Sequence, residues 1–215
     1  MLALAAITLS TDACSTACDT PKQANIDGAE LAQAKGVFKA EPGDATIVLT
    51  AKSLEPEIPE GKTIRLAVER TVQWKHVNPV LDRLDAAHKK IIYLVGKRRH
   101  VRAFHLREKL KVDSKHAFRL IASHKGRSCV APAGSAEMSC VQRIDKKHID
   151  RAFTRDIVRT AHKNYGLSDV IVEVDAELEW ADVVRAVDAA RTCCDKPLRV
   201  FVKAGLRDQS AEIKR

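Results

Sequence analysis

The stretch Val170–Ala204 reads VIVEVDAELEWADVVRAVDAARTCCDKPLRVFVKA. It begins with a β-branched apolar run of strand length. From Trp180 onward the apolar residues recur at three- and four-residue spacing, which is typical of an amphipathic helix. Pro197 separates this helix from Leu198–Lys203, which is again strand-like. The stretch therefore predicts a strand–helix–strand unit.

The same pattern occurs a second time, 106 positions earlier, in Ile64–Arg99. Trp74 then corresponds to Trp180 and Asp82 to Asp188, and the chain has no other tryptophan. Solenoid repeats recur about every 20–50 residues, so this longer period indicates two similar subdomains. We expect these four residues to have structural roles, with both indole rings buried.

The remaining periodicity predicts further elements between and around the two copies. We expect helices at 29–35, 73–88, 101–110 and 154–165, the last ended by Gly166 as its cap, and a strand at 116–123. The fold class is therefore α+β.

Composition divides the chain into five parts: 1–18 with the character of a secretory or lipoprotein leader, 19–43 as a polar spacer, 44–110 as the first repeat, 111–204 as the second, and 205–215 as a polar tail. Cys14 and Cys18 are the candidates for a lipid anchor. No apolar run reaches the roughly 20 residues that a transmembrane helix needs. We expect a protein that is soluble or tethered at its N-terminus.

Positive charge is concentrated in the middle of the chain. The whole chain has a formal net charge of +9, whereas residues 89–127 contain thirteen Lys and Arg against Glu108 and Asp113, a net +11. Such a segment attracts polyanions, and the alternative is a solvated basic linker. The candidate polyanion-binding residues are Lys97, Arg98, Arg99, Arg102, Arg107, Lys109 and Lys111.

Six cysteines favour an oxidising compartment, because their spacing fits no zinc site. We expect Cys129 and Cys140 to form a disulfide, while ordinary reduced cysteines remain the alternative. Cys193 and Cys194 are adjacent, so either they are redox-active or one of them bonds elsewhere.

Motifs of catalysis and nucleotide binding do not occur in this sequence. A phosphate-binding loop, a nucleophile elbow and a zinc-protease helix motif are all missing, and the eight histidines are scattered through polar segments. We expect a protein without catalytic residues, metal or cofactor, and therefore not an enzyme.

The phrase VIVEVDAELEWADVVRAVDAAR resembles the C-terminal half of the periplasmic domain of the ExbD/TolR biopolymer-transport family, with Asp175, Trp180, Val183, Val184, Val187, Asp188 and Ala189 carrying the likeness. The resemblance covers about 146–203 and, less closely, 62–98. It implies subdomains with two helices packed on one face of a small mixed sheet. The family's transmembrane helix with its proton-handling aspartate is missing here. Because the family's domain acts as a dimer, two copies in one chain imply a pseudo-dimer.

The expected function is that of a non-enzymatic, exported protein of the bacterial periplasm or cell envelope. Its partner would be another envelope protein or an anionic polymer such as peptidoglycan. The first alternative is a basic α/β nucleic-acid-binding protein, whose affinity would fall steeply with salt. The second is a thiol oxidoreductase that uses Cys193 and Cys194.

Overall fold

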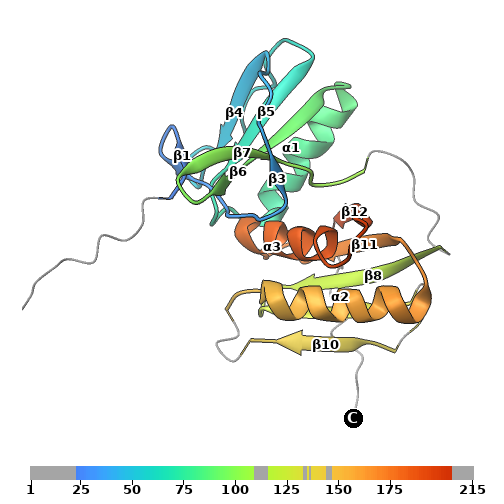
Figure 1. The fold of residues 1–215 in the computed structure, drawn as a ribbon. Helices are drawn as coiled ribbons and strands as arrows, with labels where there is room; N and C mark the ends of the chain where they lie inside the picture. Colours follow the sequence, from blue (N-terminus) through green and yellow to red (C-terminus); the bar gives the residue numbers. More distant parts are fainter. Residues whose placement is uncertain (1–22, 109–115, 133–134, 136, 144–146, 205–215) are drawn as a thin grey trace, which may run out of the picture.

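The chain folds into two halves, each built on a five-stranded mixed sheet (Figure 1). The computed structural model describes residues 23–108, 116–132, 135, 137–143 and 147–204. We call 23–108 the first half and 116–204 the second half. The predicted α+β class is confirmed, and the two sheets are similar in size.

The first sheet has the strand order β3-β7-β6-β5-β4. Its strands are β3 (Val37–Phe38), β4 (Ala45–Leu49), β5 (Thr63–Val68), β6 (Lys90–Lys97) and β7 (His100–Phe104). β4, β5 and β6 are parallel, and helix α1 (Trp74–Ala86) connects β5 to β6. β7 and β3 extend the β6 edge in antiparallel pairing. A small separate sheet pairs β1 (Asn25–Ile26) with β2 (Ala29–Glu30).

The second sheet has the order β10-β9-β8-β11-β12. Its strands are β8 (Ala117–Ser123), β9 (Arg127–Ala131), β10 (Ser139–Gln142), β11 (Asp169–Val174) and β12 (Arg199–Ala204). β8, β11 and β12 are parallel, and helix α3 (Trp180–Arg191) connects β11 to β12. Each half thus contains three parallel strands, two of which are joined by the repeated helix. The predicted strand–helix–strand unit is confirmed in both halves.

Helix α2 (Arg151–Tyr165) packs beside α3 over β8, β9 and β10. It starts three residues earlier than predicted, because the Asp150 carboxylate caps it by accepting bonds from the amides of Ala152 (2.9 Å) and Phe153 (3.1 Å). Gly166 ends it in the left-handed conformation (φ 66°), which confirms the predicted cap. Among the helices of the described residues, none has the length and apolarity to span a bilayer.

Three helix predictions are wrong. Residues 100–104 form β7, because the β6–β7 hairpin pairs them with β6, and tertiary pairing outweighs the local spacing. Residues 29–35 are extended. The expectation of two helices per half fails in the first half, where α1 is the only described helix. The connection between its first two parallel strands contains Pro56 and Pro59, which disfavour a helix there.

The segment expected as a polar spacer is built into the fold from residue 23 onward. It contributes β1, β2 and β3, and five of its apolar side chains are buried: Ala24, Ala29, Leu31, Ala32 and Ala34. Leu31 and Ala24 cover the face of the first sheet that carries Ala67 and Leu94. The predicted leader 1–18 and tail 205–215 lie outside the described residues.

The two tryptophans meet where the halves join. Trp74 and Trp180 each begin a helix, and their rings stack with centroids 6.3 Å apart and planes 2° apart. Both rings are buried, as predicted, with exposed fractions of 1% and 0%. The largest hydrophobic cluster consequently contains residues of both halves.

The backbone around this pair is bonded reciprocally. The Trp74 amide donates to the Leu178 carbonyl (2.8 Å), and the Trp180 amide donates to the Val72 carbonyl (2.7 Å). One residue further along each helix, the Lys75 amide donates to the Ala176 carbonyl and the Ala181 amide donates to the Arg70 carbonyl, both at 2.9 Å. The four bonds are related by the 106-residue offset. Each helix therefore has its first amides capped by the other half.

We expect a double-mutant cycle to reveal coupling between the stacked rings. Trp74→Ala and Trp180→Ala should each reduce the free energy of unfolding by about 3–5 kcal/mol, because each leaves a cavity in the shared core. The two effects should be non-additive by about 0.5–1.5 kcal/mol, the size of a buried aromatic pair. Denaturant titration of the four proteins measures both quantities. Phe153→Ala, at an exposed ring, is the control, and strict additivity would show that the rings do not interact.

Candidate functional site

A pocket of about 560 Å³ opens where the two halves meet, and we call it the junction pocket. It is lined by Gln33, Ala34, Lys35, Lys97, Arg98, Arg151, Arg185 and Asp188. The lining comes from the N-terminal segment, the β6–β7 hairpin, the start of α2 and the middle of α3. Five of these eight residues are cationic and one is acidic, so the pocket is strongly positive.

The acidic residue, Asp188, is completely buried and fully engaged. Its carboxylate accepts bonds from the amides of Lys35 (3.1 Å) and Gly36 (2.7 Å), and it forms an ion pair with Arg151. A Cβ atom at Gly36 would lie 3.1 Å from the Asp188 Oδ1 atom and 3.0 Å from the Thr192 methyl group, so a larger residue would disturb this approach. Asp188 thus joins the N-terminal segment, α2 and α3 at the floor of the pocket.

Asp188 and Asp82 occupy equivalent repeat positions but have different surroundings. The Asp82 carboxylate is exposed and accepts a hydrogen bond from the Asn78 side-chain amide, one turn earlier in α1 (3.0 Å). The predicted structural role is therefore visible at Asp188, while Asp82 makes a local contact on the surface.

The predicted basic residues divide among three places. Lys97 and Arg98 line the junction pocket, with Arg99 next to them in the hairpin turn, where Arg98 has a positive φ of 58°. Arg102 lies half-buried on β7, and Arg107 pairs with Asp85. Lys109 and Lys111 lie outside the described residues.

Sequence reasoning missed three cations of the junction pocket: Lys35, Arg151 and Arg185. Each lies outside the basic middle segment 89–127. Their spacing in the sequence gives no signal, because the fold brings together residues more than 100 positions apart. Arg151 and Arg185 are ion-paired with the α3 carboxylates Asp188 and Asp182, so their positions are fixed.

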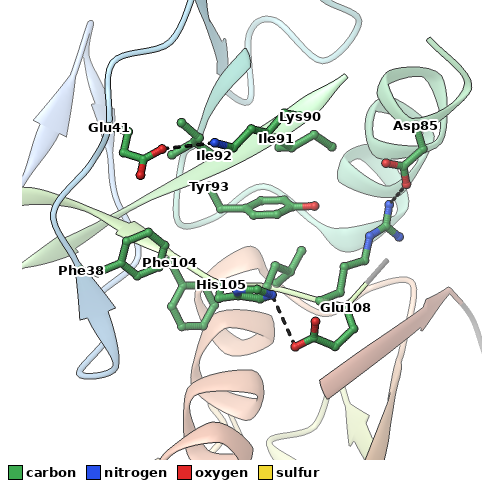
Figure 2. Close-up of a pocket in the computed structure, with 12 residues that line it drawn as sticks. Phe38, Glu41, Asp85, Lys90, Ile91, Ile92, Tyr93, Phe104, His105 and Glu108 are labelled. Atoms are coloured by element: carbon green, nitrogen blue, oxygen red, sulfur yellow. Dashed lines mark hydrogen bonds and ion pairs between the residues drawn. The ribbon is translucent and has the colours of Figure 1, made fainter. Parts of the chain in front are cut away.

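A second pocket, of about 430 Å³, lies at the edge of the first half (Figure 2). Its apolar walls include Phe38 and Phe104, and ion pairs surround them: Glu41 with Lys90 (3.2 Å), Asp85 with Arg107, and Glu108 with Arg191 (3.3 Å). The His105 Nε2 atom also lies 3.5 Å from the Glu108 carboxylate. Burial and the neighbouring Arg191 guanidinium lower the pKa of His105, while Glu108 opposes them. Since its charges are mutually paired, this pocket does not favour an ion of either sign.

The Tyr93 ring lies in this second pocket (Figure 2). Its hydroxyl is near Arg107. Burial raises the pKa of Tyr93 to about 12, Arg107 opposes the shift and Asp85 adds to it. The folded protein therefore keeps this phenol protonated at pH values where an unfolded chain ionises it.

Two pairs of cysteines are bonded in the structure. Cys129 on β9 and Cys140 on β10 face each other across the strand pair and form a disulfide, as expected. Cys193 and Cys194, at the end of α3, are bonded to each other, and Cys193 is 3% exposed. Cys14 and Cys18 lie outside the described residues.

One group of side chains in the described part of the chain has the composition of a metal site. The ligand atoms of His148, Glu179 and Asp182 lie within 4.8 Å of one another at the start of α3. No spacing in the sequence points to this group, because His148 lies more than 30 residues before the two acids.

We expect Tyr93 to make stability fall in strongly alkaline solution. Between pH 10 and 12 the unfolded phenol ionises while the folded phenol stays protonated, so the folded state binds more protons and loses stability as the pH rises. The contribution lost by pH 12 is on the order of 3 kcal/mol. Denaturant titrations of wild type and Tyr93→Phe across this range measure it. Identical pH dependence in the two proteins would contradict the assignment.

Comparison of the chain with protein-family models, with curated proteins and with solved structures finds no match. The function is therefore inferred from the geometry above. The junction pocket is the most distinctive feature of the described structure, because both halves supply cations to it.

Proposed function

We propose that this protein is a non-enzymatic binding protein of the bacterial cell envelope, and that it holds an anionic wall polymer in the junction pocket. The observation that carries the proposal is the set of cations around that pocket: Lys35, Lys97, Arg98, Arg151 and Arg185. They converge from segments of both halves on a space of about 560 Å³, large enough for several groups of a polymer.

Three of these cations are available to a ligand. The side chains of Lys35, Lys97 and Arg98 are exposed and have no acidic partner among the described residues. The carboxylate of Asp188 does not cancel them, since its oxygens are already engaged by two backbone amides and Arg151. A groove lined by one sign of charge concentrates ligands of the opposite sign.

The resemblance to the periplasmic domain of ExbD/TolR proteins agrees with this proposal. The second half has two helices, α2 and α3, beside one sheet, as the resemblance implies, and α3 carries the matching residues Val183, Val187 and Asp188. The reciprocal backbone bonds at Trp74 and Trp180 support the view that the two halves are a covalent version of a dimer. The first half departs from the pattern because it has one described helix.

The bonded cysteines support the proposed export of the protein to the cell envelope. The disulfides Cys129–Cys140 and Cys193–Cys194 are stable in an oxidising compartment such as the periplasm. The alternative of a thiol oxidoreductase would have to start at Cys194, because thiol exchange needs access to sulfur, Cys193 is 3% exposed and Cys194 is half-buried. Insulin reduction at a measurable rate would favour that alternative.

We expect reversal of two pocket charges to abolish most of the binding. Lys97→Glu with Arg98→Glu should weaken the binding of soluble peptidoglycan fragments by about tenfold or more, because attractive contacts become repulsive and each tenfold corresponds to about 1.4 kcal/mol. Fluorescence anisotropy with labelled fragments measures the affinity at several salt concentrations. Lys52→Glu with Lys163→Glu is the matched control, since it changes the net charge equally at exposed positions outside the pocket.

Duplex DNA in the same assay tests the nucleic-acid alternative. Tighter binding of DNA than of peptidoglycan fragments at physiological salt, with a steep salt dependence, would replace the wall polymer by nucleic acid as the ligand. Equal effects of the pocket variant and its control would show that the net charge, and not the junction pocket, attracts the polymer.

A further inference from the structure

We propose that His148, Glu179 and Asp182 form a binding site for a divalent transition-metal ion, for which Zn²⁺ is the probe. The site lies at the start of α3 and does not rest on the anion-binding function proposed above, although Arg185, which lines the junction pocket, also pairs with Asp182. The three ligand atoms lie within 4.8 Å of one another, and the His148 Nδ1 atom is 3.1 Å from the Asp182 Oδ2 atom. Ligands around a tetrahedral zinc ion are about 3.3 Å apart, with bonds of about 2.0–2.2 Å, so small side-chain movements suffice.

Asp182 is held in the orientation that a metal ligand requires. Its side chain is 2% exposed, and its Oδ1 atom accepts bonds from the Ile149 amide (3.1 Å) and from the Arg185 guanidinium. The Oδ2 atom faces His148. Arg185 and a metal ion would therefore use different oxygens, and the bonds to Oδ1 act as the outer contacts that orient a ligating carboxylate.

Glu179 is free to bind because of the way in which α3 is capped. The residue before a helix often accepts bonds from the first helical amides through its side chain, above all when it is Ser, Thr, Asp or Asn. The amides of Trp180 and Ala181 instead donate to the carbonyls of Val72 and Arg70 in the other half. The Glu179 carboxylate makes no capping bond and has no partner among the described residues, although it is half-buried.

His148 is positioned by its backbone. Gly126, in the β8–β9 turn, packs directly against it: a Cβ atom there would lie 2.6 Å from the His148 carbonyl oxygen, and the turn has a positive φ of 66°. The amide of the next residue, Ile149, is bonded to Asp182. The imidazole is therefore presented to α3 from a fixed segment, with about a third of its side chain exposed so that water can complete the coordination.

The chemistry of these three groups selects the class of ion. One imidazole nitrogen and two carboxylate oxygens suit Zn²⁺ and related transition metals better than Ca²⁺ or Mg²⁺, which prefer oxygen alone. On binding, the metal takes the Nδ1 lone pair of a neutral His148, whose proton resides on Nε2. The metal cation would also offset the negative charge of the Glu179 and Asp182 carboxylates. Arg185 pairs with Asp182 and so neutralises only part of that charge.

The test is calorimetric titration of the chelator-treated full chain with Zn²⁺. We expect one ion per chain, and at least about tenfold weaker binding by Glu179→Gln and by His148→Gln. Both residues are partly exposed, so these variants should fold, which thermal unfolding without metal can verify. Glu177→Gln is the control: it lies in the same turn, is exposed and pairs with Lys75, and it should bind Zn²⁺ like wild type.

Cobalt(II) provides a second readout that identifies the ligands. Nitrogen and oxygen ligation should give weak visible bands that Glu179→Gln alters. A strong thiolate charge-transfer band would assign binding to the cysteines and overturn the proposal. The proposal would also fail if wild type bound no Zn²⁺ or if Glu179→Gln bound it unchanged.

Discussion

The reciprocal capping of two helices is the interaction on which the rest of the structure depends. The first amides of a helix need acceptors, and neither Gln73 nor Glu179 supplies one from its side chain. The acceptors are carbonyls of the opposite turn, brought into place by the stacked tryptophans. Each half thus completes the other, and the hydrophobic core is continuous across the junction.

Both candidate sites are consequences of this junction. Because backbone carbonyls take the helical amides, the Glu179 carboxylate is left beside His148 and Asp182. One to two turns further along α3, Arg185 and Asp188 line the pocket that the β6–β7 hairpin reaches from the other half. The repeated helix therefore has three functions in its second copy: it packs the core, it carries the acidic cluster and it forms the floor of a cationic pocket.

Helix α3 holds two buried carboxylates, Asp182 and Asp188, and each is bonded to a different segment of the chain. Asp182 joins α3 to the segment before α2 through the Ile149 amide, whereas Asp188 joins it to the N-terminal segment through the amides of Lys35 and Gly36. A buried charge is costly unless it is paired and hydrogen-bonded, and both aspartates also pair with an arginine. Such contacts fix the relative positions of segments that the hydrophobic core alone would not order.

The sequence by itself determined the elements whose signal is local. The 106-residue repeat, the burial of both tryptophans, the strand–helix–strand units and the Gly166 cap follow from periodicity and from residue type, since a strand face or a helix stripe must be buried. The helices predicted from local spacing do not form at 101–104 or at 29–35, because pairing with a neighbouring strand or packing across the first sheet outweighs helical spacing.

The tertiary structure alone decided which charged residues act together. Lys97 and Arg98 could be named from the basic segment, but Lys35, Arg151 and Arg185 could not, because their proximity arises from the way in which the halves dock. Equivalent repeat positions also diverged: Asp82 lies on an exposed helix face, whereas Asp188 is covered by the N-terminal segment and α2. Sequence periodicity specifies the faces of helices and strands, and the environment of each face is set by what packs against it.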